Sequence, residues 1–522
     1  MYKNLLSVAG MTLLSRMTGF LRDVVLGAVL GAGALADAFY IAFRLPNHFR
    51  AIFAEGAFNA AFVPSYARVL ERRGHDDARR FGGQILTLLL ASQLVLLAFA
   101  WGFTPELVGL LAPGLRDRPG EMSAAVTMTR ITFPYLTFVT LVTLLSGVLN
   151  AHGKFAAAAF APVLLNLVMV GFLGIAFLFP DAGIAASFGI ACAGVLELGL
   201  LILAARKAGV LSRLGKPALS ADVKQFFTAL VPAVIGSAGV QMALFADTII
   251  GSMLPEGGIS SIYYADRIYQ LPIGVIGIAA GTVLLPEMSR RLAGGDEAGA
   301  FYAQNRTMAL TLALSAPFFI AFTLIPDIIM RGVFLRGAFT PEAASASARV
   351  LSAYSLGLFA IVLIRSGVAS FQSRGDTRTP MLVSLAAVAF NVGLKLVLFT
   401  PFGAAGLAAA TAAGAWVNFG LLVFLALRAG AMRPDALLGK VALATGLACL
   451  ALACVAIFGR TPAATLAASF GGLAAMVELA LLGLAGALTY GIALIGLLRL
   501  LGVRAAKLKP AAKAAAEPPL PI

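Results

Sequence analysis

The sequence predicts an all-α polytopic membrane protein with 14 transmembrane helices. Of its 522 residues, 60% are hydrophobic and 12% are charged, and the mean hydropathy is +0.93. Apolar runs of about 20 residues, long enough to cross a hydrocarbon core, recur along the chain. The expected spans lie at roughly 7–30, 36–66, 82–103, 122–150, 157–179, 183–205, 222–254, 260–288, 307–332, 344–371, 380–400, 404–427, 438–458 and 472–501.

The positive charge alternates between loops. Of the 39 lysines and arginines, 22 lie at the termini or in loops after even-numbered spans, and 4 lie in loops after odd-numbered spans. This bias follows the positive-inside rule and predicts that both termini are cytoplasmic. A stripe of basic residues for nucleic acid would not alternate in this way, so no nucleic-acid partner is expected. The first apolar run has no small-residue cleavage site after it, and we interpret it as a retained span.

An internal repeat predicts the domain organisation. The segment GLLILAARKAG at 199–209 aligns without gaps with GLLVFLALRAG at 420–430. Six spans separate the copies, so both have the same orientation, as in parallel repeats related by an axis along the membrane normal. We expect two six-helix lobes, a substrate site between them and transport by rocking of one lobe against the other. The predicted divisions are lobes at 1–215 and 216–432, two further helices at 433–502 and a disordered cytoplasmic tail at 503–522.

Four arginines interrupt apolar sequence: Arg16, Arg22, Arg50 and Arg267. A cation at bilayer depth costs about 3 kcal/mol on the insertion scale, so such residues are expected to line a polar cavity. The planar guanidinium group binds phosphate or carboxylate through two parallel hydrogen bonds. The arginines therefore predict a transporter of an anionic substrate, although snorkelling to the membrane surface is the alternative for each.

Acidic residues accompany these arginines. Asp23, Asp37 and Glu55 are expected to support them, with Asp37 and Glu55 as partners of Arg50 or Arg22; charge balancing alone is the alternative. Gly19 offers a bend point in the first span, and Pro46 is expected to kink or break the second.

Two further charged residues are isolated in the expected second lobe. Asp247 and Lys395 would each be costly without a partner, so we hypothesise that they pair. Reversing both charges together should restore what either single reversal destroys. Nucleotide-binding loops, metal-spaced His/Cys clusters and catalytic dyads are missing from the sequence. We therefore expect no catalytic residue, metal or cofactor, and energy from the membrane potential, an ion gradient or the substrate's own gradient.

Several segments are similar to one family. The chain resembles the MurJ (MviN) lipid II flippases of the MOP exporter superfamily through SRMTGFLRD (15–23), DAFYIAFRLPNHFRAIFAEGAFNAAFVP (37–64), RITFPY (130–135), FAPVLLN (160–166), YYADRIYQLPIGVIGIAAGTVLLPEMS (263–289) and FQSRGDTRTP (371–380). The resemblance implies that the chain moves lipid II, the undecaprenyl-pyrophosphate-linked disaccharide pentapeptide, across the bacterial inner membrane. Membrane lipids and the cell-wall synthesis machinery are the partners it implies, and a monomer is expected.

The resemblance also assigns roles. The family's essential cavity arginines occupy the places of Arg16, Arg22, Arg50 and Arg267, and acidic residues match Asp37 and Glu55. In the family the last two helices receive the polyprenyl tail. Some members bind sodium, and Asp247 and Asn391 match that site in kind. The ammonium group of Lys395 would repel sodium, which favours coupling to the membrane potential.

Two other functions remain open from the sequence. The first is another exporter of the same superfamily, for lipid-linked oligosaccharides or for drugs. Fourteen spans and an arginine-rich first lobe argue against a drug exporter. The second is a membrane-embedded enzyme or assembly scaffold, against which the lack of a placed nucleophile or metal set argues.

Overall fold

All regular secondary structure in the described part of the chain is helical. The computed structural model describes residues 2–50 and 57–503, without the side chains of 2–9, 49, 57, 235–243, 278 and 279. The chain packs as two compact units, Met1–Tyr264 with Phe334–Ala346, and Ala265–Val333 with Ser347–Ile522. Within the described residues, ten helical segments are long and apolar enough to cross a membrane. The all-helical membrane fold is thus confirmed, whereas the count of 14 spans stays a prediction.

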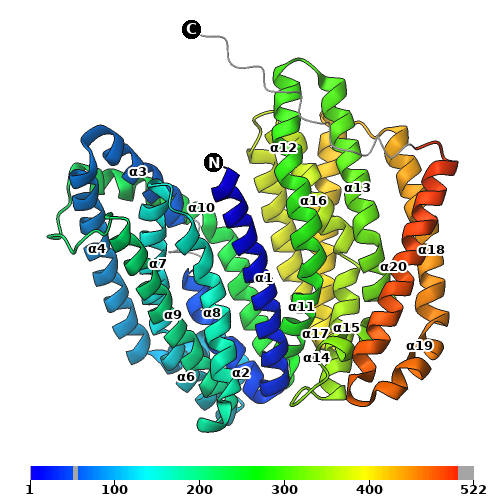
Figure 1. Ribbon diagram of the computed structural model, residues 1–522, viewed down its shortest axis with the longest axis horizontal. Helices are drawn as coiled ribbons and strands as arrows, with labels where there is room; N and C mark the ends of the chain where they lie inside the picture. The colour runs from blue at the N-terminus through cyan, green and yellow to red at the C-terminus, as the bar shows by residue number, and fades with distance from the viewer. Residues whose placement is uncertain (1, 51–56, 504–522) are drawn as a thin grey trace. The chain divides into compact units, whose positions relative to one another are not determined.

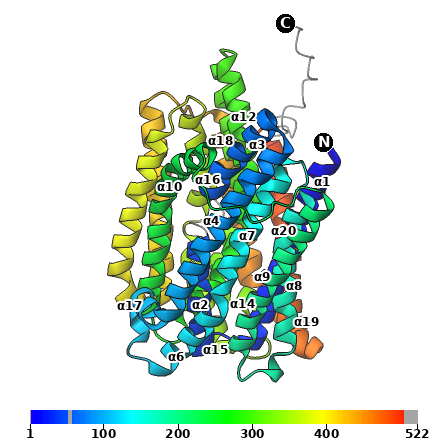
Figure 2. The same cartoon turned by 90° about the vertical axis from the view of Figure 1, so that its left-hand side faces the viewer.

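The first unit contains the helices from the N-terminus to the start of α11 (Figure 1). They are α1 (Tyr2–Leu30), α2 (Ala34–Arg50), α3 (Ala57–Arg73), α4 (His75–Gly102), α5 (Thr104–Leu111), η2 (Pro113–Leu115), α6 (Pro119–Thr132), α7 (Pro134–Ala151), α8 (Ala156–Gly174), η3 (Ala176–Leu178), α9 (Ala182–Lys207), α10 (Ala221–Ser252) and α11 (Gly258–Pro272). Helices α3, α4 and α7 lie side by side (Figure 2).

An aromatic core joins the helices of this unit. Phe58 and Phe62 on α3 stack with ring centroids 5.2 Å apart, and Phe226 on α10 meets Phe58 edge to face at 5.7 Å. All three side chains are at most 2% exposed. Helix α10, the first helix of the predicted second lobe, therefore packs on α3 within the first unit. The units are defined by packing, and the lobe boundaries read from the repeat stay a prediction.

Prolines act differently at two places in this unit. Pro134 stands at the first position of α7 and divides the predicted span 122–150 into α6 and α7, as expected of a residue without a backbone N–H. Pro46, by contrast, lies inside α2, which continues to Arg50. Pro46 was expected to kink or break the helix; the break is wrong, because a helix can continue past a proline when other groups satisfy the freed carbonyl, and the kink stays a prediction.

The second unit begins within α11 and contains most of the later helices. They are η4 (Ile273–Gly277, a π-helical turn), α12 (Ile278–Ala293), α13 (Glu297–Leu324), α14 (Pro326–Phe334), α15 (Pro341–Ser355), α16 (Leu358–Gln372), α17 (Arg378–Arg428), α18 (Ala436–Phe458), α19 (Arg460–Ala467), η5 (Ala468–Leu473) and α20 (Ala474–Leu500). The N-terminal part of α15 and the last residue of α14 belong to the first unit.

A glycine interrupts the long segment α17. Gly403 has φ +56°, which L-amino acids with side chains rarely adopt, and it follows Pro401 by two residues. The interruption lies between the predicted spans 380–400 and 404–427. Farther along, α18 and α20 pack against each other and α18 packs on α13 (Figure 1). The Tyr490 hydroxyl on α20 donates a 2.6 Å hydrogen bond to the Ala313 carbonyl of α13.

Candidate functional site

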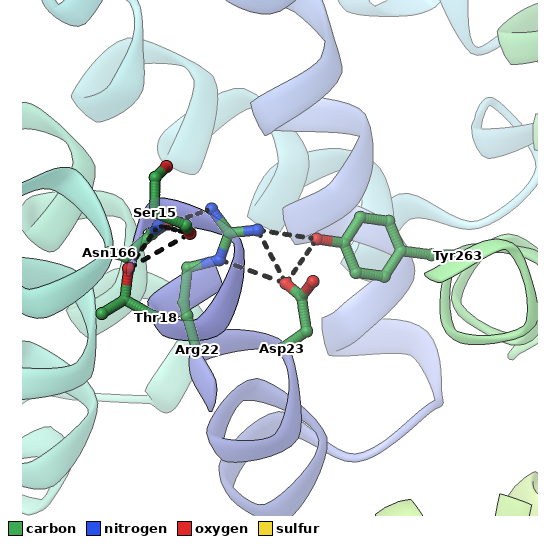
Figure 3. A network of polar contacts seen from close by, with 6 residues as sticks. All are labelled: Ser15, Thr18, Arg22, Asp23, Asn166 and Tyr263. Atoms are coloured by element: carbon green, nitrogen blue, oxygen red, sulfur yellow. Dashed lines mark hydrogen bonds and ion pairs between the residues drawn. The ribbon is translucent and has the colours of Figure 1, made fainter. Parts of the chain in front are cut away.

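Arg22 lies at the centre of a buried polar network in the first unit (Figure 3). The residue is 8% exposed. Its Nε and Nη2 donate to Asp23 Oδ1 at 3.1 and 2.7 Å, and its Nη1 donates to Asn166 Oδ1 at 3.0 Å. The expected supporting role of Asp23 thus takes the form of a direct ion pair within α1. Asn166 comes from α8, which packs along α1.

A tyrosine closes the network from α11. The Tyr263 hydroxyl donates to Asp23 Oδ1 at 2.9 Å and lies 3.4 Å from Arg22 Nη2 (Figure 3). Its ring stacks on Tyr40 of α2, with centroids 3.9 Å apart and an interplanar angle of 23°. This stacking fixes the position of the hydroxyl. Sequence analysis missed Tyr263, which was noted only as part of the YYADR motif.

Asn166 also binds the helix that carries Arg22. Its Nδ2 donates to the Ser15 carbonyl at 3.1 Å and to Thr18 Oγ1 at 3.2 Å. A Cβ atom on Gly19 would lie 3.3 Å from this nitrogen, so the glycine allows α8 to approach α1. Helix α1 is continuous from Tyr2 to Leu30. Gly19 therefore serves close packing in this structure, a role that its sequence position alone does not indicate.

Arg16 lies in different surroundings. It is exposed and lines a pocket of about 450 Å³ at α1 and α8, together with Thr12, Ser15, Asn150 and Phe155 among others. Arg22 does not line this pocket. The structure therefore brings one of the two α1 arginines into a polar network and leaves the other at an open pocket.

Asp37 binds backbone amides at the start of α11. Its Oδ2 accepts from the Gly257 N–H at 2.8 Å and its Oδ1 from the Ser260 N–H at 2.7 Å, and the residue is 1% exposed. In return, Glu256 Oε1 accepts from the Ala34 N–H at the start of α2 at 3.1 Å. Each carboxylate satisfies donors that a helix start leaves without partners. Asp37 was expected beside an arginine; its hydrogen bonds instead cap a helix.

The remaining candidates of α2 lie near its C-terminal end. Arg50 is the last residue of the helix, and its Nε donates to Asn47 Oδ1 at 3.1 Å. His48 Nε2 lies 3.0 Å from Thr248 Oγ1 of α10. Because that hydroxyl also donates to the Leu244 carbonyl, His48 is placed to be the donor to Thr248. Glu55 lies outside the described residues.

The other predicted residues are divided between the units. Asp247 lies on α10 in the first unit, whereas Arg267, Asn391 and Lys395 lie in the second. Lys395 is 3% exposed, and Arg267 is half-buried. The pairing of Asp247 with Lys395 stays a prediction. Within the described residues, no group of three or more His, Cys, Asp or Glu side chains is placed to hold a metal ion.

The fold and this network define a polytopic helical membrane protein with ionised groups buried inside its bundle. The model of the family described as "Lipid II flippase MurJ" matches residues 26–471. A "Probable lipid II flippase MurJ" of Rhizobium meliloti (strain 1021) is 42% identical over 431 residues, which cover 81% of this chain and 80% of that protein. The chain therefore belongs to the MurJ family, and the family resemblance seen in its motifs is confirmed.

Solved structures show the same fold. A structure described as "Lipid II flippase MurJ, inward closed conformation" aligns with a TM-score of 0.78 and 22% identity, covering 95% of this chain and 99% of that one. An inward-facing multidrug resistance MATE transporter of the MOP superfamily aligns with a TM-score of 0.64 and 14% identity, covering 80% and 95% of the two chains.

Proposed function

We propose that this chain is a flippase that moves lipid II from the cytoplasmic to the periplasmic leaflet of a bacterial inner membrane. Membership of the MurJ family and the 42% identity to a relative named as such a flippase support this function. A transporter, rather than an enzyme, accords with this family. The observation that carries the proposal is the buried guanidinium group of Arg22, which donates hydrogen bonds to three side chains of the bundle.

In this proposal the pyrophosphate of lipid II binds to Arg16, Arg22, Arg50 and Arg267, which together line a central cavity. The Arg22 guanidinium is already oriented by Asp23, Asn166 and Tyr263, so little side-chain entropy is lost when an anion binds to it. Asp23 holds the guanidinium in place and competes with the substrate for it. A pyrophosphate can displace this carboxylate because it carries more negative charge.

Alternating access completes the proposed mechanism. The two lobes open the cavity first to the cytoplasm and then to the periplasm, while the polyprenyl tail stays in the bilayer along the helices of 433–502. The membrane potential returns the empty cationic cavity, since one charge crossing 100 mV is worth about 2.3 kcal/mol. The protein acts as a monomer with both termini in the cytoplasm, alongside the cell-wall synthesis machinery.

Leaflet-resolved measurement of lipid II tests this function. Cells that depend on Arg22→Ala are expected to accumulate lipid II in the inner leaflet and to lyse. Arg22→Lys keeps the charge and loses the fork that reaches Asn166 and Asp23 together, so we expect an intermediate defect. Arg80→Ala, at an exposed arginine of α4, is the matched control and should leave the distribution unchanged. Normal lipid II distribution in the Arg22→Ala cells would refute the proposed role of this arginine.

The second candidate is another MOP-superfamily exporter, for drugs or lipid-linked oligosaccharides. The fold shared with the MATE transporter is the observation that favours it. Depletion of the protein separates the two functions. Lysis with accumulated lipid II supports the flippase, whereas drug sensitivity with normal lipid II supports the exporter. Repeating the measurement with a collapsed membrane potential tests the proposed energy source.

A further inference from the structure

Two guanidinium groups of the second unit lie over the ring of one buried phenylalanine. Phe301, on the first turns of α13, is 7% exposed. The Cζ atom of Arg374, in the turn after α16, lies 5.6 Å from the ring centroid, and that of Arg433, between α17 and α18, lies 5.2 Å from it. Three separate segments of the chain thus bring two positive charges to one aromatic ring.

Hydrogen bonds hold the side chain of Arg374 and the backbone of Arg433. Arg374 Nη1 donates to the Ser370 carbonyl at 2.7 Å, at the end of α16. Asn305, one turn after Phe301 and 2% exposed, donates from Nδ2 to the Arg433 carbonyl at 2.7 Å. A contact to an aromatic face is worth about 0.5–1 kcal/mol at an exposed site, so the ring adds to this positioning. The Arg374 guanidinium group is therefore held by a hydrogen bond and the ring, whereas the Arg433 guanidinium group contacts the ring and the Arg433 backbone is held by Asn305.

The charge of this pair is poorly compensated. Glu297 Oε1 lies 3.9 Å from Arg374 Nη2, and the glutamate side chain is 55% exposed. A long, exposed ion pair of this kind contributes little. Among the described residues, no carboxylate lies within 4 Å of the Arg433 guanidinium. Burial lowers the pKa of Arg374, and Glu297 offsets this effect only in part. Within the part of the chain that the structure describes, the two arginines at the Phe301 ring are thus accompanied by one carboxylate within 4 Å, that of Glu297.

The pair lies at the ends of helices that can cross the membrane. Segments containing α13, α16, α17 and α18 are all long and apolar enough to do so. Arg374 and Arg433 belong to loops that the charge alternation places on the cytoplasmic side. The turn between α12 and α13, whose helices are labelled in Figure 1, comes shortly before Phe301 in the sequence. On this predicted orientation, the two arginines would lie near the phosphates of the inner leaflet.

We propose that Arg374 and Arg433 form a binding site for a phosphate group, supplied by an anionic phospholipid headgroup of the cytoplasmic leaflet. Guanidinium groups bind phosphate oxygens through paired, charge-assisted hydrogen bonds. A phosphate in contact with both guanidinium groups would compensate both charges. The site is separate in sequence from the proposed transport arginines, and its occupation does not depend on the transported lipid. Free inorganic phosphate offers the same chemistry from solution.

Lipid titration of the purified full-length protein tests the site. Binding of phosphatidylglycerol is measured by native mass spectrometry and compared with that of zwitterionic phosphatidylethanolamine. One arginine near the membrane surface is worth about 5-fold in affinity for anionic lipid, so we expect about 30-fold weaker phosphatidylglycerol binding for Arg374→Gln with Arg433→Gln. The control is Arg428→Gln, because Arg428 lies 4.9 Å over the Phe424 ring in the same unit but has no second guanidinium on that ring. This control should lose no more than the about 5-fold that one arginine near the membrane surface contributes.

A second variant separates binding from a purely structural role. Glu297→Gln removes the carboxylate that competes with the phosphate, so phosphatidylglycerol affinity should rise severalfold. A structural ion pair would not give this increase. Melting temperatures measured without lipid show whether the variants fold. If the double variant does not fold, phosphatidylglycerol binding by Glu297→Gln and Arg433→Gln tests the proposal instead.

The outcomes are distinct. Competition by millimolar inorganic phosphate supports the phosphate chemistry and identifies a free anion as a second source. Unchanged lipid affinity in the folded double variant overturns the proposal. Equal losses in the double variant and in Arg428→Gln overturn it as well, since they would reflect general surface charge. Failure of the transport variants leaves this result unaffected, because lipid titration does not measure flipping.

Discussion

Asp37 on α2 accepts a 2.7 Å hydrogen bond from the backbone N–H of Ser260 on α11, 223 residues later in the chain. The same carboxylate accepts the Gly257 N–H, and Glu256 accepts the Ala34 N–H at the start of α2. Two helices thus exchange carboxylate caps at their N-termini. The favourable interaction of each carboxylate with the helix dipole adds to these hydrogen bonds.

Asp37→Ala should lower the melting temperature of the purified protein clearly. Loss of the cap leaves the buried Ser260 N–H and the half-buried Gly257 N–H without this acceptor, which costs about 2 kcal/mol. Asp37→Asn keeps one oxygen acceptor and should lose less. Asp76→Ala removes a fully exposed carboxylate from the first turn of α4 and serves as the control. Equal melting temperatures for Asp37→Ala and Asp76→Ala would contradict the capping role.

Gly19→Ala should impair flipping more than it impairs folding. The added Cβ would lie 3.3 Å from Asn166 Nδ2, so that side chain must shift away from Arg22. Lipid II distribution in dependent cells measures the effect, and protein abundance in the membrane measures folding. Gly10→Ala on the same helix meets no atom within 4 Å and is the matched control. Wild-type flipping with Gly19→Ala would show that Asn166 can move without loss of function.

Tyr263→Phe should reduce flipping modestly. It removes the hydroxyl between Asp23 and Arg22 and leaves the ring stacked on Tyr40. The expected cost is about 1 kcal/mol, since Asp23 Oδ1 retains both bonds from Arg22. Tyr269→Phe, whose ring stacks on Tyr354, provides the comparison. A defect as large as that of Arg22→Ala would mean that the tyrosine does more than orient the guanidinium.

Glu287→Gln should destabilise the second unit strongly. Glu287 accepts hydrogen bonds from Arg291 and Arg306, both at 3.1 Å, and the Arg306 side chain is only 5% exposed. Removal of the carboxylate leaves that buried charge without compensation, at a cost of about 3 kcal/mol. Arg291→Gln should cost at most about 1 kcal/mol because its side chain is more exposed. Thermal unfolding of the two variants should rank them in this order, and the reverse order would refute the argument.

Much of the helical fold could be predicted because the length of an apolar run is a local property of the sequence. The predicted span 183–205 lies within α9, and Gly403 interrupts α17 between two predicted spans. The division of one predicted span at Pro134 was missed. Its length exceeded what one crossing requires, but the pattern of apolar residues gave no sign of the break.

The candidate site was predicted less completely, because its partners are distant in the sequence. Arg22 and Asp23 are adjacent, and the free-energy cost of placing charged side chains in apolar sequence was enough to single them out. The role of Asp37 depends on backbone amides more than 200 residues away, which leave no mark in residue type. Asn166 ends the motif FAPVLLN, but its contact with Arg22 requires the packing of α8 on α1.

The ion pair between Arg22 and Asp23 has a consequence for selectivity. A singly charged phosphodiester that approaches Arg22 meets a guanidinium whose charge Asp23 already balances, at 2.7 Å. Such a headgroup gains little binding free energy when it displaces the Asp23 carboxylate from Arg22. A ligand with two or more negative charges gains from the exchange. Asp23 would thus disfavour binding of abundant, singly charged membrane phospholipids to Arg22 and still allow a diphosphate to bind.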